Sequence, residues 1–414
     1  MKFEQYSISP EIKVNLLNEG FRRPTDIQYK AIPPILKGED VLAIAQTGTG
    51  KTAAFAIPVI HHIQSLKNIG RKSGVSGLVM VPTHELAQQI TSVFLALSKN
   101  TGVKTTGIIG GENQAPQIEA LKKGTDILVA TPGRLFDLAS QGYLKMDKLK
   151  VLILDEADHM LDLGFIKDIK DLMHLIPKKR QTLFFSATIN SKIKKLAYSL
   201  VRKPIRIQIS PKNPVAKNIE HSVAFIQMDD KRAFLERLIN ENPESKILVF
   251  VRTKVRAERV KKAMERVEIK GFTIHSDKEQ KERTKTMSLF KSGEVKLLIA
   301  TDISARGIDI PNVDFVVNYD LPEVPENYVH RVGRTGRGTQ KGRAVSFCSS
   351  EEKEILLEIE SFLDKEISVL EIDKNDYRET LDFTKDTDYN WKKLIKDIEK
   401  EEKAFPAKKK RKKK

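Results

Sequence analysis

The sequence has one cysteine, few aromatic residues and no long apolar run. A single cysteine, Cys348, excludes a disulfide within the chain, as expected of a reducing compartment. No apolar run approaches the roughly 18 residues of a membrane-spanning helix, and no basic segment leads into an apolar one at the N-terminus, as an export signal would require. The eight histidines include no HExxH pair, so a zinc site is not expected. We therefore expect a cytoplasmic protein outside the membrane.

Positive charge is what the sequence has in excess. The net charge is +17, from 72 Lys and Arg against 55 Asp and Glu. The last seven residues, 408–414, are all basic, and removing them still leaves +10. A basic folded part favours a polyanionic partner. Composition alone does not separate RNA, DNA, an anionic membrane and a merely soluble basic protein.

The chain of 414 residues is long enough for two domains. Apolar runs such as DVLAIA, GLVMVP, TDILVA, KVLILD and QTLFFS each precede a helical segment, and a second series of such runs begins after residue 218. This alternation is typical of parallel sheets with crossover helices. The sequence predicts an α/β protein with parallel-sheet domains at 1–207 and 219–365, a proline-containing linker at 208–218 and a partly disordered basic tail at 366–414.

A phosphate-loop pattern, AQTGTGKT, lies between an apolar run and a helical segment. Gly48 and Gly50 would turn backbone N–H groups toward phosphates, and Lys51 would reach the β- and γ-phosphates of ATP. The Thr52 hydroxyl would help to hold Mg²⁺. Ala45 stands where the usual pattern has glycine, so a chance glycine turn is the alternative. The full set of predicted contacts is Ala45, Gln46, Thr47, Gly48, Thr49, Gly50, Lys51 and Thr52.

Three carboxylates follow the apolar run VLIL, in the motif DEAD. At the carboxyl edge of a parallel sheet, Asp155 would hold Mg²⁺ through water, and Glu156 would orient and deprotonate an attacking water. An acidic helix start is an equal reading of the motif in isolation, and the phosphate loop upstream favours the catalytic one.

The order of these motifs over about residues 3–347 resembles the DEAD-box ATP-dependent RNA helicases. The stretch LPEVPENYVHRVGRTGR is similar to the bacterial RhlE-like branch of that family. The resemblance implies two RecA-like domains and an RNA-dependent ATPase that separates short duplexes or displaces proteins from RNA. It also implies a monomer that binds RNA without sequence specificity, in ribosomal or RNA-decay assemblies. Gln28 would read adenine, since a carboxamide can bond to N6 and N7, and Phe3 would pack over the adenine ring.

The resemblance further assigns RNA contacts and residues that couple the two sites. The predicted RNA-binding residues are Pro82, Thr83, Gly111, Thr131, Pro132, Gly133, Arg134, Gln280, Arg283, Thr301 and Asp302, and the coupling residues are Asp158, Ser186, Thr188 and His330. Isolated Pro-Thr or Thr-Pro-Gly segments are ordinary helix-start and turn signals. The chain departs from the family at His84, where arginine is usual, and at Ser276, where glycine is common.

Arginines are dense in HRVGRTGRGTQKGR, residues 330–343. By resemblance, Arg334 and Arg337 would be arginine fingers that complete the ATP site from the second domain, and Asp309 would meet the ribose. The alternative is a surface patch that binds RNA alone. Arg343 has no assigned role.

Two other functions remain open from the sequence. One is a DNA translocase of the same superfamily, and the other is a non-catalytic, ATP-gated RNA clamp or annealing chaperone. Gln28 and the complete DEAD motif favour RNA, while Lys51, Glu156 and the two arginine fingers favour hydrolysis. The lysine run at 408–414 would add salt-sensitive attraction to RNA or serve solubility alone.

Overall fold

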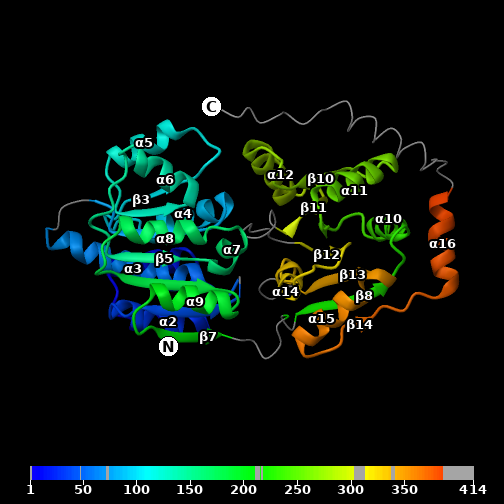
Figure 1. The fold of residues 1–414 in the computed structure, drawn as a ribbon, viewed down its shortest axis with the longest axis horizontal. Helices are drawn as coiled ribbons and strands as arrows, with labels where there is room; N and C mark the ends of the chain where they lie inside the picture. Colours follow the sequence, from blue (N-terminus) through cyan, green and yellow to red (C-terminus); the bar gives the residue numbers. More distant parts are fainter. Residues whose placement is uncertain are drawn as a thin grey trace, which may run out of the picture.

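The computed structural model describes residues 2–46, 48–70, 74–209, 215, 218–302, 313–336 and 341–385. The chain forms two α/β domains, each built on a seven-stranded sheet with all pairings parallel (Figure 1). This confirms the predicted fold class. Within the described ranges, no helix is both long enough and apolar enough to span a membrane.

The first sheet has the strand order β3-β4-β2-β5-β6-β1-β7. Its strands are β1 (Val41–Ala45), β2 (Gly77–Met80), β3 (Thr105–Ile108), β4 (Ile127–Ala130), β5 (Val151–Leu154), β6 (Gln181–Ser186) and β7 (Ile205–Ile209). The surrounding helices are η1 (Phe3–Gln5), α1 (Pro10–Asn18), α2 (Asp26–Leu36), α3 (Lys51–Asn68), α4 (His84–Leu97), α5 (Gln114–Lys122), α6 (Pro132–Ser140), α7 (Ala157–Asp162), α8 (Ile166–Leu175) and α9 (Ser191–Leu200).

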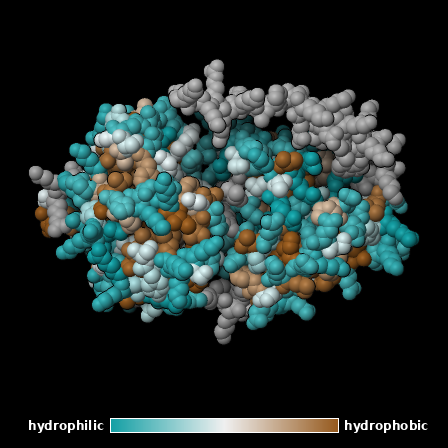
Figure 2. All heavy atoms as spheres, in the orientation of Figure 1, coloured by the Kyte–Doolittle hydropathy of each residue, from teal (hydrophilic) through white to brown (hydrophobic). Residues whose placement is uncertain are grey.

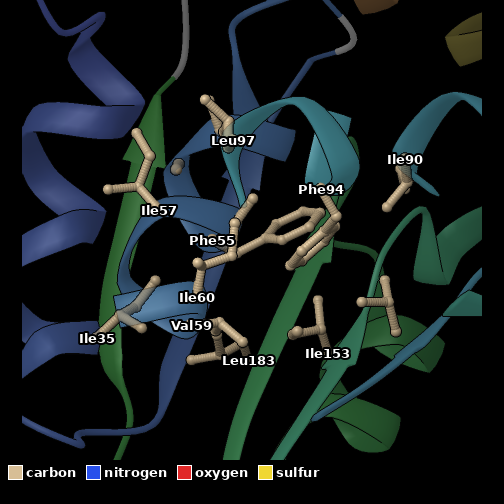
Figure 3. Packing of buried hydrophobic residues seen from close by; sticks show 14 of the residues in the cluster. Ile35, Phe55, Ile57, Val59, Ile60, Ile90, Phe94, Leu97, Ile153 and Leu183 are labelled. Atoms are coloured by element: carbon tan, nitrogen blue, oxygen red, sulfur yellow. The ribbon is translucent and has the colours of Figure 1, made fainter. Parts of the chain in front are cut away.

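Helices cover both faces of this sheet, which explains why its central strands are apolar throughout. Alternate residues of β1 belong to different hydrophobic clusters: Val41 and Ala43 to one, Leu42 and Ile44 to the other. In the first cluster the ring of Phe55 lies 5.2 Å from Phe185 and 6.1 Å from Phe94, centroid to centroid (Figure 3). This packing fixes α3, and with it the phosphate loop that precedes α3, against the sheet.

The second sheet has the order β10-β11-β9-β12-β13-β8-β14. Its strands are β8 (Ile219–Phe225), β9 (Ile247–Phe250), β10 (Gly271–Ile274), β11 (Leu297–Ala300), β12 (Phe315–Asn318), β13 (Gly342–Cys348) and β14 (Ser368–Val369). Its helices are α10 (Lys231–Glu241), α11 (Lys254–Arg266), α12 (Gln280–Ser292), α14 (Pro325–Val332), η2 (Ser350–Glu352), α15 (Lys353–Leu363) and α16 (Lys374–Lys385).

The folded part of the second domain extends beyond the boundary expected at residue 365. Strand β14 pairs with β8 at the sheet edge, and α16 packs on α10, where the rings of Tyr377 and Phe234 lie 4.8 Å apart. Sequence reasoning assigned both segments to the tail, because β14 has two residues and α16 is strongly charged. Residues 386–414 lie outside the described part. The expected linker at 208–218 overlaps the last two residues of β7 and ends just before β8.

A buried network of charges joins strand ends and helix starts in the second domain. Lys231 is fully buried, and its ammonium donates to the carboxylate of Glu352 and to the carbonyl of Tyr319. Asp320 lies 3.9 Å from the same ammonium and 2.9 Å from the Arg256 guanidinium. Glu352 also accepts from the backbone N–H of Leu321. Each buried charge is therefore compensated by partners from other elements, as burial requires.

We predict that Lys231→Met destabilises the second domain by about 3–5 kcal/mol, because Glu352 and Asp320 would stay buried without their ammonium partner. Urea unfolding followed by circular dichroism measures the loss. Lys261→Ala is the matched control, since it removes a partly exposed pair with Glu265 that contributes about 0–1 kcal/mol. Equal effects of the two substitutions would contradict a stabilising role for the network.

Candidate functional site

The carboxyl ends of the parallel strands position nearly all of the predicted site residues. In the first sheet, β5, β6 and β1 are neighbours, and β3, β4 and β2 are neighbours. In the first domain, the phosphate loop follows β1, Asp155 and Glu156 follow β5, and the predicted coupling residues Ser186 and Thr188 lie at the end of β6, whereas the residues predicted to face RNA follow β2, β3 and β4. Phe3 and Gln28 lie on η1 and α2. The strand order therefore separates the two groups along one edge of the sheet, the edge where open α/β sheets bind ligands.

The phosphate loop connects β1 to α3 through two glycines that other residues would strain. Gly48 and Gly50 have φ values of 81° and 93°, in the left-handed region that favours glycine. A Cβ at Gly50 would also lie 2.6 Å from Nε2 of Gln28. Lys51 is the first residue of α3, so the loop delivers its backbone N–H groups to the positive end of the helix, a site for phosphate.

Gln28 is buried and ties α2 to this loop. Its Oε1 accepts from the backbone N–H of Thr25 at 3.0 Å, and its Nε2 donates to the carbonyl of Gly50 at 3.1 Å. Both ends of the carboxamide thereby form hydrogen bonds within the protein. To contact an adenine edge, Gln28 would replace one of these hydrogen bonds with one to the base. Phe3 is 4% exposed and packs edge-on against Phe21. Stacking of Phe3 on a base stays a prediction.

A buried ammonium and two buried carboxylates meet beside the loop. Lys51 Nζ lies 4.0 Å from Oδ1 of Asp155, and within the described part it has no hydrogen-bond partner. Burial raises the pKa of Asp155 to about 6, against the opposing charge of Lys51. An unpartnered buried ammonium at a helix start indicates room for an anionic ligand.

Glu156 stays ionised in this buried position. Burial alone would raise its pKa, but the hydrogen bond to His159 and the charges of Lys51, His159 and Arg334 lower the pKa to about 2. Its backbone adopts φ 51°, in the left-handed region, where a non-glycine residue stores strain of the kind found at active sites. Arg334 belongs to the second domain, so both domains hold Glu156 as a carboxylate.

The third carboxylate of the motif joins β5 to β6. Asp158 Oδ2 accepts from the backbone N–H groups of Ala187 and Thr188 at 3.1 and 3.0 Å, and from the Thr188 hydroxyl at 3.1 Å. Ser186 is fully buried beside this contact, and its hydroxyl has no hydrogen-bond partner within the described part. Movement at the SAT segment would therefore be transmitted to the residues around Glu156.

The predicted RNA contacts of the first domain lie at the ends of β2, β3 and β4. Thr83 caps α4 by accepting from the backbone N–H of Leu86, and Pro82 precedes it. Thr131 and Pro132 begin α6, with Gly133 in its first turn. Arg134 donates to the carbonyl of Glu112 at 2.9 Å, while its Nη1 is buried and lacks a partner among the described residues. These helix starts present donors to a phosphate backbone.

On the RNA side, Glu85 and His84 of the first domain contact Gln280 and Arg283 of the second. Glu85 accepts from Arg283 at 2.8 Å and from Nε2 of Gln280 at 3.3 Å. The ring of His84 lies 3.3 Å from Oε1 of Gln280, so Nδ1 is the donor in this contact. Gly111, at φ 69°, leaves room for the Gln280 side chain, which lies 3.4 Å from the position of a Cβ. His84 therefore takes part in a contact between domains.

Asp302, predicted to face RNA, is held by a buried arginine. Arg331 donates to both oxygens of Asp302, with Nε at 2.6 Å and Nη2 at 2.8 Å, and to the Asp320 carbonyl at 2.7 Å. Arg334, one turn further on, is 4% exposed and donates to the His330 carbonyl at 3.1 Å. Thr301 follows β11 directly. Thr47, Asp309 and Arg337 lie outside the described residues.

Sequence reasoning missed three residues that the structure brings into the site: Glu85, His159 and Arg331. The Arg331 signal was available, because Tyr328, Arg331 and Val332 have the spacing of a buried helix face. An arginine on such a face indicates a compensated charge. The sequence held no comparable signal for Glu85 and His159. The tertiary fold brings the partners of Glu85 to it, and the turn at Glu156 brings Glu156 to His159.

Comparison with known proteins gives the family. Residues 25–196 match the DEAD/DEAH box helicase model, and residues 230–339 match the helicase conserved C-terminal domain. The chain is 40% identical over 375 residues to the ATP-dependent rRNA helicase RRP3 of Candida glabrata, covering 90% of this chain and 75% of that protein. It is 38% identical to the DEAD-box ATP-dependent RNA helicase RhpA of Helicobacter pylori, over 89% and 74% of the two chains.

The chain belongs to the DEAD-box family of ATP-dependent RNA helicases. Its two sheets are the tandem RecA-like domains of this family. As a family member it is an ATP-hydrolysing RNA helicase.

Solved structures of DEAD-box proteins also indicate how the two domains are arranged. Saccharomyces cerevisiae Dbp5 bound to RNA and ADP BeF3 matches with a TM-score of 0.81 at 28% identity, over 92% of this chain and 99% of that one. A DEAD box protein from Methanococcus jannaschii is 37% identical over 90% of this chain and 99% of that one, yet gives 0.51. The Methanococcus jannaschii protein is more identical to this chain in sequence than Dbp5 is, yet it has the lower TM-score. This indicates that its two domains are placed differently relative to each other. The overall structure of this chain is therefore more similar to that of Dbp5 bound to RNA and ADP BeF3 than to that of the Methanococcus jannaschii protein.

We predict that Gln28→Glu weakens ATP binding about tenfold, because a carboxylate cannot donate to the Gly50 carbonyl and a lost buried bond costs about 1–3 kcal/mol. Titration with a fluorescent ATP analogue measures the affinity. Gln88→Glu, a similar change at an exposed position of α4, should leave it unchanged. Unaltered binding by Gln28→Glu would show that the tie to Gly50 does not shape the loop.

We predict that Arg283→Ala lowers RNA-stimulated ATP turnover by at least tenfold while ATP binding is retained, because Glu85 is left largely buried without its interdomain partner. A double-mutant cycle with Glu85→Ala measures the coupling. If Arg283 contacts only RNA, the losses of ATP turnover in the two single variants will add up in the double variant, and this would contradict an interdomain role. Lys123→Ala, which removes an exposed pair with Glu119, is the control.

Proposed function

We propose that this DEAD-box protein hydrolyses ATP between its two domains and couples hydrolysis to local separation of short RNA duplexes or removal of proteins from RNA. The observation that supports this most directly is Glu156. It is a buried carboxylate beside Lys51 of its own domain, and Arg334 of the other domain helps to keep it ionised. Hydrolysis then depends on domain placement, which RNA can influence.

ATP would occupy the carboxyl edge of the first sheet. The phosphate loop, residues 45–52, would hold the phosphates through backbone N–H groups and Lys51, while Gln28 would recognise adenine with Phe3 beside it. Asp309 would meet the ribose. Glu156 has a pKa of about 2, so it is already a carboxylate at neutral pH and can accept a hydrogen bond from the attacking water. That water would be oriented for in-line attack.

The same edge fits a magnesium ion. Thr52 and Asp155 supply a hydroxyl and a carboxylate next to the phosphate loop, and no cluster of three metal-ligating side chains lies in the described part. Mg²⁺ suits such a site, because it is usually held by one or two carboxylates together with substrate phosphates and water. When bound, it would neutralise charge on the phosphates.

The second domain would complete the site with arginines. Planar guanidinium groups bind the charge that spreads over phosphoryl oxygens in the transition state, an effect worth about 10³ to 10⁵ in rate. The charge of Arg334 acts on Glu156, which supports this role for Arg334, and we assign the same role to Arg337. His330 would connect this helix end to the DEAD motif.

RNA would lie across both domains on the side of β2, β3 and β4. The proposed backbone contacts are Pro82, Thr83, Gly111, Thr131, Pro132, Gly133, Arg134, Gln280, Arg283, Thr301 and Asp302. Because Glu85 and Arg283 join the domains there, RNA and ATP favour the same arrangement and should bind cooperatively. Asp158, Ser186 and Thr188 would relay between the two sites.

We place the protein nearest the RhlE-like branch, acting in the cytoplasm as a monomer that binds RNA without sequence specificity. The motif LPEVPENYVHRVGRTGR supports the branch. Ribosomal or RNA-decay assemblies are the proposed setting. The lysine run at 408–414 would add non-specific, salt-sensitive attraction to RNA.

We predict that Glu156→Gln lowers RNA-stimulated ATP turnover by about 10²–10⁴, because an amide cannot accept the proton of the attacking water. ATP binding should be retained, since Lys51 and the loop are intact. Phosphate release is measured with RNA and with DNA of the same sequence, and Asp171→Asn on the outer side of α8 is the control. Normal turnover by Glu156→Gln refutes the hydrolytic role, and equal stimulation by DNA refutes the preference for RNA.

A further inference from the structure

A cavity opens on the face of the second sheet that α10 leaves uncovered. The 11 residues of α10 span about 16 Å, whereas the seven residues of β8 span about 23 Å. Beside α10, from Phe234 to its end, a space of about 480 Å³ lies over β8, β13 and β12, bounded by residues 370–372 and the start of α16. This volume is within the range of about 300–1,000 Å³ typical of ligand pockets.

The cavity lies on a face of the second sheet, along β8 and the residue that follows it, from Glu220 to Ile226, and not at the edge that carries the nucleotide and RNA sites. It is lined by Glu220, Phe315 and Arg343, which are at the amino ends of their strands, whereas the site residues follow carboxyl ends. Figure 1 shows α10 and α16 on the side of the second domain that faces away from the first domain. A ligand could therefore occupy it without blocking ATP or RNA.

The chemistry of the cavity is apolar at the floor and acidic at the rim. Phe315, Val345 and Phe347 form the floor, with Leu238, Leu370 and Ile372 at the sides. The rim carries four carboxylates and two arginines: Glu220, Glu241, Glu371, Asp376, Arg237 and Arg343.

Both rim arginines are engaged by neighbours. Arg237 pairs with Glu241 at 2.7 Å and donates to the Thr380 hydroxyl, and Arg343 stacks on the Phe315 ring at 4.0 Å. In a chain of net charge +17, this is a locally acidic site. An apolar ligand with flanking positive charge fits it.

We propose that this cavity binds the C-terminal segment of the same chain, residues 391–398, with Trp391 as the anchor. Trp391, Leu394, Ile395 and Ile398 recur at the i, i+3, i+4, i+7 spacing of one apolar helix face. Lysines at 392, 393 and 396 separate them. The segment thus has an apolar stripe that matches the apolar floor of the cavity and positive charge that complements its acidic rim.

The chain is long enough to make this contact. Asp376 lines the cavity near the start of α16, and Lys385 at its end is nine residues further along, about 14 Å along the helix axis. Six more residues lead to Trp391 and can span about 20 Å. Trp391 can therefore return to the cavity. Because the contact is within one chain, its effective concentration is high and a weak contact suffices.

The experiment uses the full chain and the fluorescence of its single tryptophan. The proposal predicts a blue-shifted emission maximum and poor quenching by acrylamide in the native protein, both lost in Leu370→Lys, which places a cation at the acidic rim. Leu370 is 47% exposed, so the change should not unfold the domain, and circular dichroism verifies this. Leu357→Lys is the matched control on α15. It lies outside the cavity lining, is 64% exposed and should retain the native signal. Figure 2 shows hydrophobic residues exposed among hydrophilic ones on the visible face of the second domain.

Four results would overturn the proposal. The first is emission from a fully accessible Trp391 in the native protein, and the second is protection of Trp391 from acrylamide that survives Leu370→Lys. The third is protection that is lost equally in Leu357→Lys. The fourth is protection that grows with protein concentration, which would identify a second copy of the chain as the occupant. Protection that appears only after RNA is added would likewise assign Trp391 to RNA stacking. A severalfold rise in acrylamide quenching in Leu370→Lys alone, at all protein concentrations and without RNA, supports docking within the chain.

Discussion

The structure depends on keeping one buried carboxylate ionised between cations from two domains. Burial raises the pKa of Glu156. The hydrogen bond to His159 and the charges of Lys51 from the first domain and Arg334 from the second lower it. Asp155, equally buried, has a pKa raised to about 6, so the neighbouring carboxylates titrate apart, as in many acid–base sites. His159 and Lys51 of the first domain contribute most to keeping Glu156 ionised, and Arg334 of the second domain adds to them. The presence of the second domain therefore favours the ionised base.

The second condition is set by the order of the strands. Strands β5, β6 and β1 are neighbours, and β3, β4 and β2 form the other half of the sheet. The residues predicted to bind nucleotide and those predicted to bind RNA therefore lie at different places along the same edge. Two interactions cross between the domains: the charge of Arg334 acts on Glu156, and Arg283 forms an ion pair with Glu85. Both depend on the same placement of the two domains. The two ligands therefore bias one equilibrium, which is the physical basis of coupling.

Sequence patterns predicted the parallel sheets and the local parts of the site, because periodicity and glycine turns are local signals. The strands missed were β3, β7 and β14: β3 begins with two threonines, β7 borders the expected linker, and β14 has two residues. The Glu85 contact could not be predicted, since its partner Gln280 is 195 residues away. Nor did the sequence show that Gln28 holds Gly50, because a capping glutamine and a ligand-binding glutamine have the same local pattern.

Concentrating function at one edge has a consequence for the opposite end of each sheet. The carboxyl edge of the second sheet is filled by compensated charges: Lys231 with Glu352, and Arg331 with Asp302. These interactions hold the strand ends rigid where Arg334 must be placed. At the amino ends no such demand exists, and part of the sheet face beside α10 is left uncovered. Covering its apolar floor would remove apolar surface from water, which is favourable. In this chain a basic segment containing the only tryptophan lies within reach.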